Sequence, residues 1–146
     1  MLYICNIFYY SMISGKFAIT IHILTLLTQF PDEFLSSEFI ASSMNLHPVL
    51  VRKEIANLKK NNLVESKEGK NGGTRLSKKA DTISLDAIFK MTFETVTLGY
   101  AKNDPNPACP VGRQINKKLD ILYANINEKI YAELSGMTLK DFANQF

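Results

Sequence analysis

The pattern of apolar and polar positions along the chain predicts helices first, then a short β-hairpin, then helices again. After Ser14, a candidate N-cap, apolar side chains recur at helical spacing until Pro31 ends the pattern. These positions are Phe17, Ile19, Ile21, Ile23, Leu24 and Leu27. We expect a buried helix here. His22 lies within it with no second metal ligand at suitable spacing, so we expect a packed core histidine.

Two short helices joined by a tight turn are predicted next. Ser36 or Ser37 caps the first, Asn45 marks the turn, and Pro48 takes the first position of the second, where its missing N–H costs nothing. The second helix has an apolar stripe formed by Val51, Ile55 and Leu58. Its opposite side carries Val49, Arg52, Lys53, Ala56, Lys59 and Lys60. This pattern is typical of a helix-turn-helix, although the segment alone fits an ordinary amphipathic helix with solvated lysines better.

The stretch that follows favours the helix-turn-helix interpretation. "LVES" and "TRLS" are short strand candidates, and Gly69, Gly72 and Gly73 between them supply the positive φ angles that a hairpin needs. The loop matches neither of the glycine spacings of phosphate-binding loops, and it leads into a strand rather than a helix. A hairpin directly after a helix-turn-helix is a wing. We therefore expect a mainly α fold with a small β-hairpin, namely a winged helix-turn-helix.

Charge indicates what the winged helix would bind. The 146 residues suit one domain and carry a net charge of only +3. Residues 47–79, however, contain nine lysines and arginines against three glutamates, a local charge of +6. Such a cationic region favours a polyanionic partner. We expect the second helix of the pair to enter the major groove of double-stranded DNA, with Lys70, Asn71 and Arg75 at the wing tip contacting the minor groove or phosphates.

These residues also carry a family resemblance. The segment "HPVLVRKEIANLKKNNLVESKEGKNGGTRLSKKADTISLDAIF" resembles the core of the bacterial Rrf-two family of winged-helix regulators. The matching features are the Pro-Val-x-Val-Arg start at Pro48, Leu58, Leu63-Val64, Gly72-Gly73 and the final "ISLDAIF". The resemblance implies a homodimeric transcription factor, usually a repressor, that binds a roughly palindromic operator. A cytoplasmic location is expected separately, because "MLYICNIFYYSMI" is a poor signal peptide and no clean apolar span follows it. The residues expected to contact DNA are Ser37, His47, Pro48, Val49, Arg52, Lys53, Lys70, Asn71 and Arg75.

Several members of this family hold an iron-sulfur cluster through three cysteines. Here Cys109 alone lies in the corresponding region, and Cys5 is more than a hundred residues away. One thiolate cannot supply the ligands of a cluster, so we expect a branch of the family without a cofactor.

Cys109 nevertheless suggests a hypothesis about sensing. Arg113, at the start of the next helix, could lower the thiol pKa and favour the reactive thiolate, which would make Cys109 a redox sensor. The alternative is a small apolar residue that fixes the loop between Pro107 and Pro110. A small-molecule effector near Phe89, Phe93 and Tyr100 is a further hypothesis, although these side chains are more simply core aromatics.

A long helix is predicted from Arg113 to Ser135, before Gly136. Its apolar stripe comprises Ile115, Leu119, Leu122, Ile126, Ile130 and Leu134. We expect the first five to form a dimer interface, and the alternative is packing on the chain's own core. A last helix capped by Thr138 should follow. The predicted division is an N-terminal extension (1–13), a winged-helix domain (14–92), a sensor loop (93–112) and the dimerisation and C-terminal helices (113–146).

Other functional classes are less well supported. No arrangement typical of a catalytic site stands out, so an enzyme is not expected. The apolar stretch of residues 17–27 is interrupted by Thr20, His22 and Thr25, so no membrane span is expected. The remaining alternative is a winged-helix module whose basic face binds an acidic protein rather than specific DNA.

Overall fold

The fold is mainly helical, with one short antiparallel hairpin. The computed structural model describes residues 2–93 and 98–146, and for residues 2–14 the backbone alone. Its elements in chain order are α1 (Leu2–Gln29), α2 (Ser37–Met44), α3 (Pro48–Lys60), β1 (Val64–Lys67), β2 (Gly73–Leu76), a 3-10 turn η1 (Ala80–Thr82), α4 (Leu85–Thr92), α5 (Ile115–Ser135) and α6 (Leu139–Ala143). The predicted order of helices and strands is confirmed.

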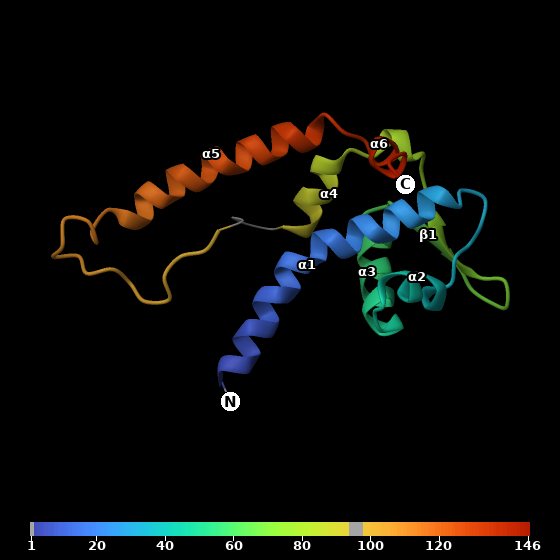
Figure 1. The fold of residues 1–146 in the computed structure, drawn as a ribbon, viewed down its shortest axis with the longest axis horizontal. Coiled ribbons are helices and arrows are strands. Elements are labelled where there is room, and N and C mark those ends of the chain that lie inside the picture. Colours follow the sequence, from blue (N-terminus) through green and yellow to red (C-terminus); the bar gives the residue numbers. More distant parts are fainter. Residues whose placement is uncertain (1, 94–97) are drawn as a thin grey trace.

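Helix α1 forms the centre of the structure (Figure 1). The side chains of Ile23, Leu24 and Leu27 are completely buried, and α2, α3, α4 and α6 all pack against this helix. Each of these short helices contributes at least one buried aliphatic side chain to the same core. Because burial of apolar surface is the main stabilising term in folding, this shared core fixes α3 relative to α1.

The start of α1 differs from the expectation. The helix begins at Leu2 rather than after Ser14, because no proline or glycine interrupts residues 2–14 and a serine within such a run does not end a helix. His22 is also exposed rather than buried in the core, and its Nε2 lies 2.9 Å from the hydroxyl of Ser43 on α2. The core-histidine prediction was therefore wrong.

The hairpin is attached to the body of the molecule through the segment before α2. Strands β1 and β2 pair with Val64 opposite Leu76 and Lys67 opposite Gly73. The backbone of Leu35 exchanges two hydrogen bonds with that of Thr74, at 2.8 and 2.9 Å. A Cβ on Gly73 would lie 2.5 Å from the carbonyl oxygen of Leu35, so this close approach requires glycine.

The three glycines of the wing do not all serve the same purpose. Gly69 and Gly73 have positive φ, as predicted, at 101° and 154°. Gly72 does not have this conformation; it is required for space, because a Cβ there would lie 2.2 Å from the carbonyl oxygen of Lys67. The prediction of a positive φ at all three glycines was thus wrong for Gly72.

Helix α5 extends away from the core, and the loop before it reaches farther still (Figure 1). Its C-terminal half is held by α4: the Tyr131 ring meets the Phe89 ring edge-on at 5.4 Å. Its N-terminal half is contacted by the preceding loop, where the Tyr123 hydroxyl donates to the carbonyl oxygen of Gly99 at 2.8 Å. Residues 94–97 of the predicted sensor loop lie outside the described residues.

Helix α6 returns the chain to the core. Thr138 and Asp141 form a reciprocal capping box, as expected for a helix that begins at Leu139. Leu139 is completely buried, and the Gln29 side chain at the end of α1 donates to the carbonyl oxygen of Ala143 at 2.7 Å. The C-terminus of the chain thus lies beside the winged-helix core, whereas α5, which stands between α4 and α6 in the chain, projects outward.

Candidate DNA-binding surface

Helix α3 is fixed by its cap and by one buried face. His47 is the N-cap residue, and its Nδ1 accepts the Val49 backbone N–H at 3.3 Å. Pro48 occupies the first helical position, as predicted. The buried side chains are Val51, Glu54, Ile55 and Leu58. The opposite side, which includes Val49 and Lys53, is exposed and has no contact with the rest of the core.

Arg52 is held by the first turn of α2. Its Nε donates to the Ser37 hydroxyl at 3.1 Å, and its terminal nitrogen forms an ion pair with Glu38. The backbone N–H of Glu38 itself, then Arg52 and then Ser37 lower the pKa of the Glu38 carboxyl. Ser36, rather than Ser37, is the N-cap of α2. Ser37 and Arg52, both expected to contact DNA, are therefore brought together in one exposed cluster.

A buried polar contact joins α3 to α1. The Thr20 hydroxyl donates to Glu54 Oε1 at 2.8 Å, and the side-chain amide of Asn57 donates to the same oxygen at 3.2 Å. Thr20 is completely buried, and Glu54 is 8% exposed. Buried carboxyl groups require such partners. This contact restrains the rotation of α3 about its own axis. The sequence patterns of the two helices did not predict it.

The wing presents two of its three expected residues at its tip. Lys70 and Asn71 are exposed in the loop between β1 and β2. Arg75 lies instead within β2, where its Nε donates to Glu65 at 2.6 Å and its guanidinium stacks 4.5 Å above the Phe34 ring. Its expected place at the tip was wrong, because the cross-strand glutamate and the aromatic ring hold it on the face of the hairpin.

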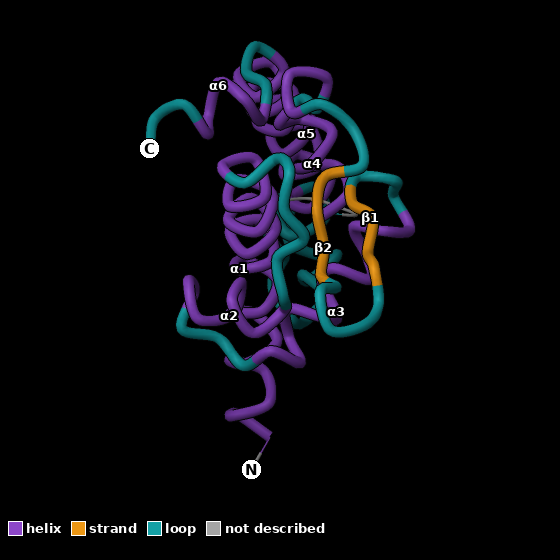
Figure 2. Tube along the Cα trace, turned by 90° about the vertical axis from the view of Figure 1, so that its right-hand side faces the viewer, coloured by secondary structure: helices purple, strands orange, loops and turns teal. Residues whose placement is uncertain are grey.

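The recognition helix and the wing tip lie at the same end of the molecule (Figure 2). Figure 1 agrees, since the hairpin tip there extends toward the level of α2 and α3. Exposed basic side chains occur on both, with Arg52, Lys53, Lys59 and Lys60 on α3 and Lys70 on the wing. Exposed basic side chains on a helix and on a hairpin loop thus lie at one end of the molecule, as a winged helix that binds DNA requires.

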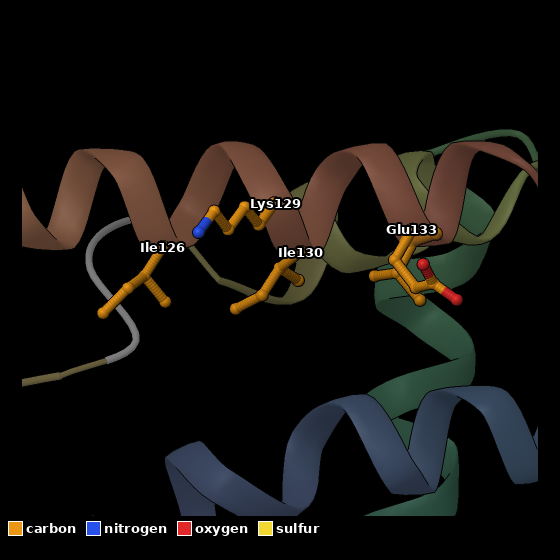
Figure 3. A pocket seen from close by; sticks show the side chains of 5 residues that line it. Ile126, Lys129, Ile130 and Glu133 are labelled. Carbon is orange, nitrogen blue, oxygen red and sulfur yellow. The ribbon is translucent and has the colours of Figure 1, made fainter.

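The apolar stripe of α5 is only partly covered by the chain itself. Leu122 is 50% exposed, and the other four residues of the predicted interface are half-buried. A shallow groove on this side is lined by Ile126, Lys129, Ile130, Glu133 and Leu134. Figure 3 shows Ile126, Ile130 and Glu133 projecting from the same side of the helix.

Cys109 lies in an exposed turn shortly before α5. The backbone N–H groups of Gly112 and then Val111 lower the pKa of its thiol. Arg113 does not act on the thiol in the expected way; its backbone N–H instead donates to the carbonyl oxygen of Cys109 at 2.9 Å. The predicted direction of the pKa shift is thus confirmed, but its predicted cause was wrong.

The aromatic residues considered for an effector site belong to two separate groups. Phe89 and Phe93 pack against each other at 4.6 Å and against Phe17 of α1. Tyr100 packs instead against Tyr123 of α5, at 5.4 Å. Phe89 is buried, so the simpler interpretation of core aromatics holds for that side chain.

Together, the fold and the basic surface define a winged helix-turn-helix protein. Residues 13–145 match the model of the Rrf2 (Rrf-two) family, described as "Iron-dependent Transcriptional regulator". YwnA of Bacillus subtilis, described as an HTH-type transcriptional regulator, is 38% identical over 133 residues, covering 91% of this chain and 98% of that protein. The chain belongs to the Rrf2 family. It is a DNA-binding transcriptional regulator, not an enzyme.

Solved structures agree with this assignment. A protein described as DNA-binding is 35% identical, with a TM-score of 0.68 and coverage of 87% of this chain and 97% of that one. CymR of B. subtilis, described as the global cysteine regulator, is 22% identical with a TM-score of 0.67, covering 90% of this chain and 95% of that one, and supports the fold.

The described residues do not fit the iron that the family description names. Among them, no three His, Cys, Asp or Glu side chains are grouped so that they could hold a metal ion. Cys109 is exposed, and the described side chains include no second cysteine. The two histidines have other partners, Ser43 for His22 and the α3 backbone for His47. We therefore assign no role to iron.

No described helix is long and apolar enough to cross a membrane.

Two glutamates that support this surface, Glu54 and Glu38, were missed in the sequence, and only the first has a local signal. Glu54 lies on the apolar side of α3, three residues after Val51 and four before Leu58, so its position signals burial. Its partner on α1 carries no such signal. Glu38 is an ordinary first-turn acidic residue of α2, and only the turn geometry brings it to Arg52.

Proposed function

We propose that this chain is a homodimeric repressor that binds a palindromic operator through α3 and the wing, without an iron-sulfur cluster. The observation that carries the proposal is the cationic surface on which α3 and the wing tip lie at the same end of the molecule. A regulator of this kind acts on the chromosome, so the cytoplasm is its expected location. Repression as the sign of regulation rests on the family resemblance alone.

Each expected DNA-binding residue has a role that its position supports. Val49 and Lys53, exposed on α3, face the major groove. Ser37, His47, Pro48 and Arg52 surround the start of α3, where phosphates of the groove edge would lie. Lys70 and Asn71 contact the minor groove or its phosphates. Arg75 supports the wing through Glu65 and Phe34 and reaches phosphate only by giving up part of that contact.

Dimerisation is supported by the partly uncovered stripe of α5. Five apolar residues, Ile115, Leu119, Leu122, Ile126 and Ile130, follow one side of a helix that projects from the core. A second copy of α5 would bury these side chains and place two recognition helices on one DNA duplex, as two half-sites of a palindrome require.

The signal is proposed to be redox or a small molecule. Cys109 supports the redox form, because an exposed thiol with a lowered pKa is more readily oxidised or alkylated. Loss of a peroxide or quinone response in Cys109→Ser would support this role, and an unchanged response would dismiss it.

The decisive experiment is a gel-shift titration against DNA from the gene's own upstream region, at two salt concentrations. Saturable, sequence-preferring binding is expected, and Lys70→Ala should weaken binding to every sequence and lower the salt slope by about one. Binding that is absent or equal on all DNA would favour the alternative, a winged-helix module that binds an acidic protein. Repression is tested separately: deletion of the gene should raise transcription from the bound promoter.

A further inference from the structure

On α3, the side chains that point directly away from the core include apolar residues as well as basic ones. Residues on a helix share one side at spacings of three and four. Opposite the buried Glu54 and Leu58, this rule places Val49, Lys53, Ala56 and Lys60, and all four are exposed. Two of the four, Val49 and Ala56, are apolar and carry no hydrogen-bonding group in the side chain, so the two lysines are the only members of this outward line that can donate to a base edge or a phosphate.

The apolar side chain of Val49 is not buried in the core that the described residues form. It is 57% exposed, although it lies in the first turn of α3, where residues of a recognition helix reach base edges. Ala56, the second apolar residue of the line, follows seven positions later. At a rise of about 1.5 Å per residue, the two lie roughly 10 Å apart along the helix, about three base-pair steps of DNA.

Arg52, which could otherwise read guanine, is turned to the side. Its guanidinium binds Ser37 and forms an ion pair with Glu38, so it is directed toward α2 rather than along the outward line. The two cations within the line, Lys53 and Lys60, fit a polyanion better than an apolar protein surface. The partner must therefore combine negative charge with small apolar groups in a groove that admits a helix.

The major groove offers one such group, the C5-methyl of thymine. We propose that Val49 and Ala56 read thymine methyl groups, so that each operator half-site contains two thymines about three base-pair steps apart. This inference rests on the proposed DNA-binding function and extends it to the chemistry of base recognition. Lys53 and Lys60 contribute phosphate attraction that does not depend on sequence.

Uracil tests the proposal, because it lacks this methyl and keeps the hydrogen-bonding edge of thymine. Duplexes that bind the full-length protein are first selected from a random-sequence pool, and the selected duplex is then synthesised with thymine or with uracil. Removing one buried methyl should weaken binding about fourfold, which corresponds to roughly 0.8 kcal/mol. Two contacts should therefore make the uracil duplex bind more than tenfold more weakly per half-site.

Two variants test whether the preference for thymine over uracil comes from the outward-pointing side chains of α3. Val49→Ala should bind the thymine duplex more weakly, leave binding to the uracil duplex nearly unchanged, and so reduce the thymine preference. Leu50→Ala is the matched control, because Leu50 is also exposed, at 46%, but lies a quarter-turn away from the line. It should keep the full preference. Circular dichroism checks that both variants are folded.

The outcomes separate this inference from the function on which it rests. Equal binding of the selected thymine and uracil duplexes by the unaltered protein would overturn thymine reading and leave DNA recognition intact. A thymine preference as large in Val49→Ala as in the unaltered protein would overturn the role of Val49, because only the contribution of Ala56 should remain in the variant. Failure to select any duplex would overturn both the inference and the proposed function.

Discussion

Thr20 on α1 donates a buried hydrogen bond of 2.8 Å to Glu54 on the recognition helix α3. The two residues are 34 positions apart in sequence, and neither side chain is more than 8% exposed. This contact is a polar link between the central helix and the helix that we propose faces DNA. It makes the orientation of α3 dependent on α1.

Removing one partner of this link should cost more than removing both. Thr20→Val leaves the buried Glu54 carboxyl without its main donor, which should lower the free energy of unfolding by about 1–3 kcal/mol. In Thr20→Val/Glu54→Leu, both polar groups are replaced by apolar ones, and much of the loss should be recovered. Urea denaturation measures the difference. Thr28→Val is the control, since the Thr28 hydroxyl donates to the Leu24 carbonyl oxygen of its own helix. If both single variants lower the free energy of unfolding equally, the link between α1 and α3 contributes nothing specific.

The ion pair between Arg52 and Glu38 should restrain DNA binding. The Glu38 carboxylate lies beside a guanidinium on the surface expected to meet phosphates, so it opposes a polyanion there. Glu38→Gln should increase affinity for non-specific DNA a few-fold at low salt, because it removes a negative charge that repels phosphates and competes with them for Arg52. The salt slope should become steeper.

Fluorescence-anisotropy titrations with a non-specific duplex test this expectation. Glu128→Gln, which removes the same charge from an exposed position on α5, should leave affinity nearly unchanged. If both variants bind equally tightly, the effect comes from net charge alone and the specific role of Glu38 is wrong.

Local sequence patterns predicted the elements well and their mutual contacts poorly. The stripe of Val51, Ile55 and Leu58 specified the inner face of α3, because helical periodicity is a property of adjacent turns. The link between Thr20 and Glu54 depends on how two helices cross, and no local pattern encodes that.

The errors in the predicted site have the same origin. Arg75 was expected at the wing tip with Lys70 and Asn71, but Glu65 and Phe34 retain it on the hairpin face. His22 was expected in the core because its neighbours are apolar, yet its turn of α1 faces Ser43 on α2. Both outcomes were decided by tertiary neighbours that are distant in sequence.

The partly uncovered stripe of α5 leads to a prediction about assembly. If a second copy covers it, Ile126→Asp should place a charge in the interface and shift the protein from dimer to monomer. Sedimentation velocity across a range of concentrations measures this change. Ala124→Asp introduces the same charge at an exposed position on the other side of α5 and should leave the dimer intact. A monomeric unaltered protein would contradict the prediction.

Cys109 should react with alkylating agents at lower pH than an ordinary cysteine. The backbone N–H groups of Gly112 and Val111 stabilise its thiolate and so lower the pKa of the thiol. Because the thiolate is the nucleophile, the rate of iodoacetamide alkylation should rise with pH and reach half its maximum below about 8.5, the usual value. Mass spectrometry of a Cys5→Ser variant, in which Cys109 alone reacts, measures the rate at each pH. In urea the same variant loses the turn, so its alkylation rate should reach half its maximum at the ordinary pH. If the folded and unfolded protein share the same midpoint pH, the turn does not activate the thiol. Cys109 would then have no basis as a redox sensor.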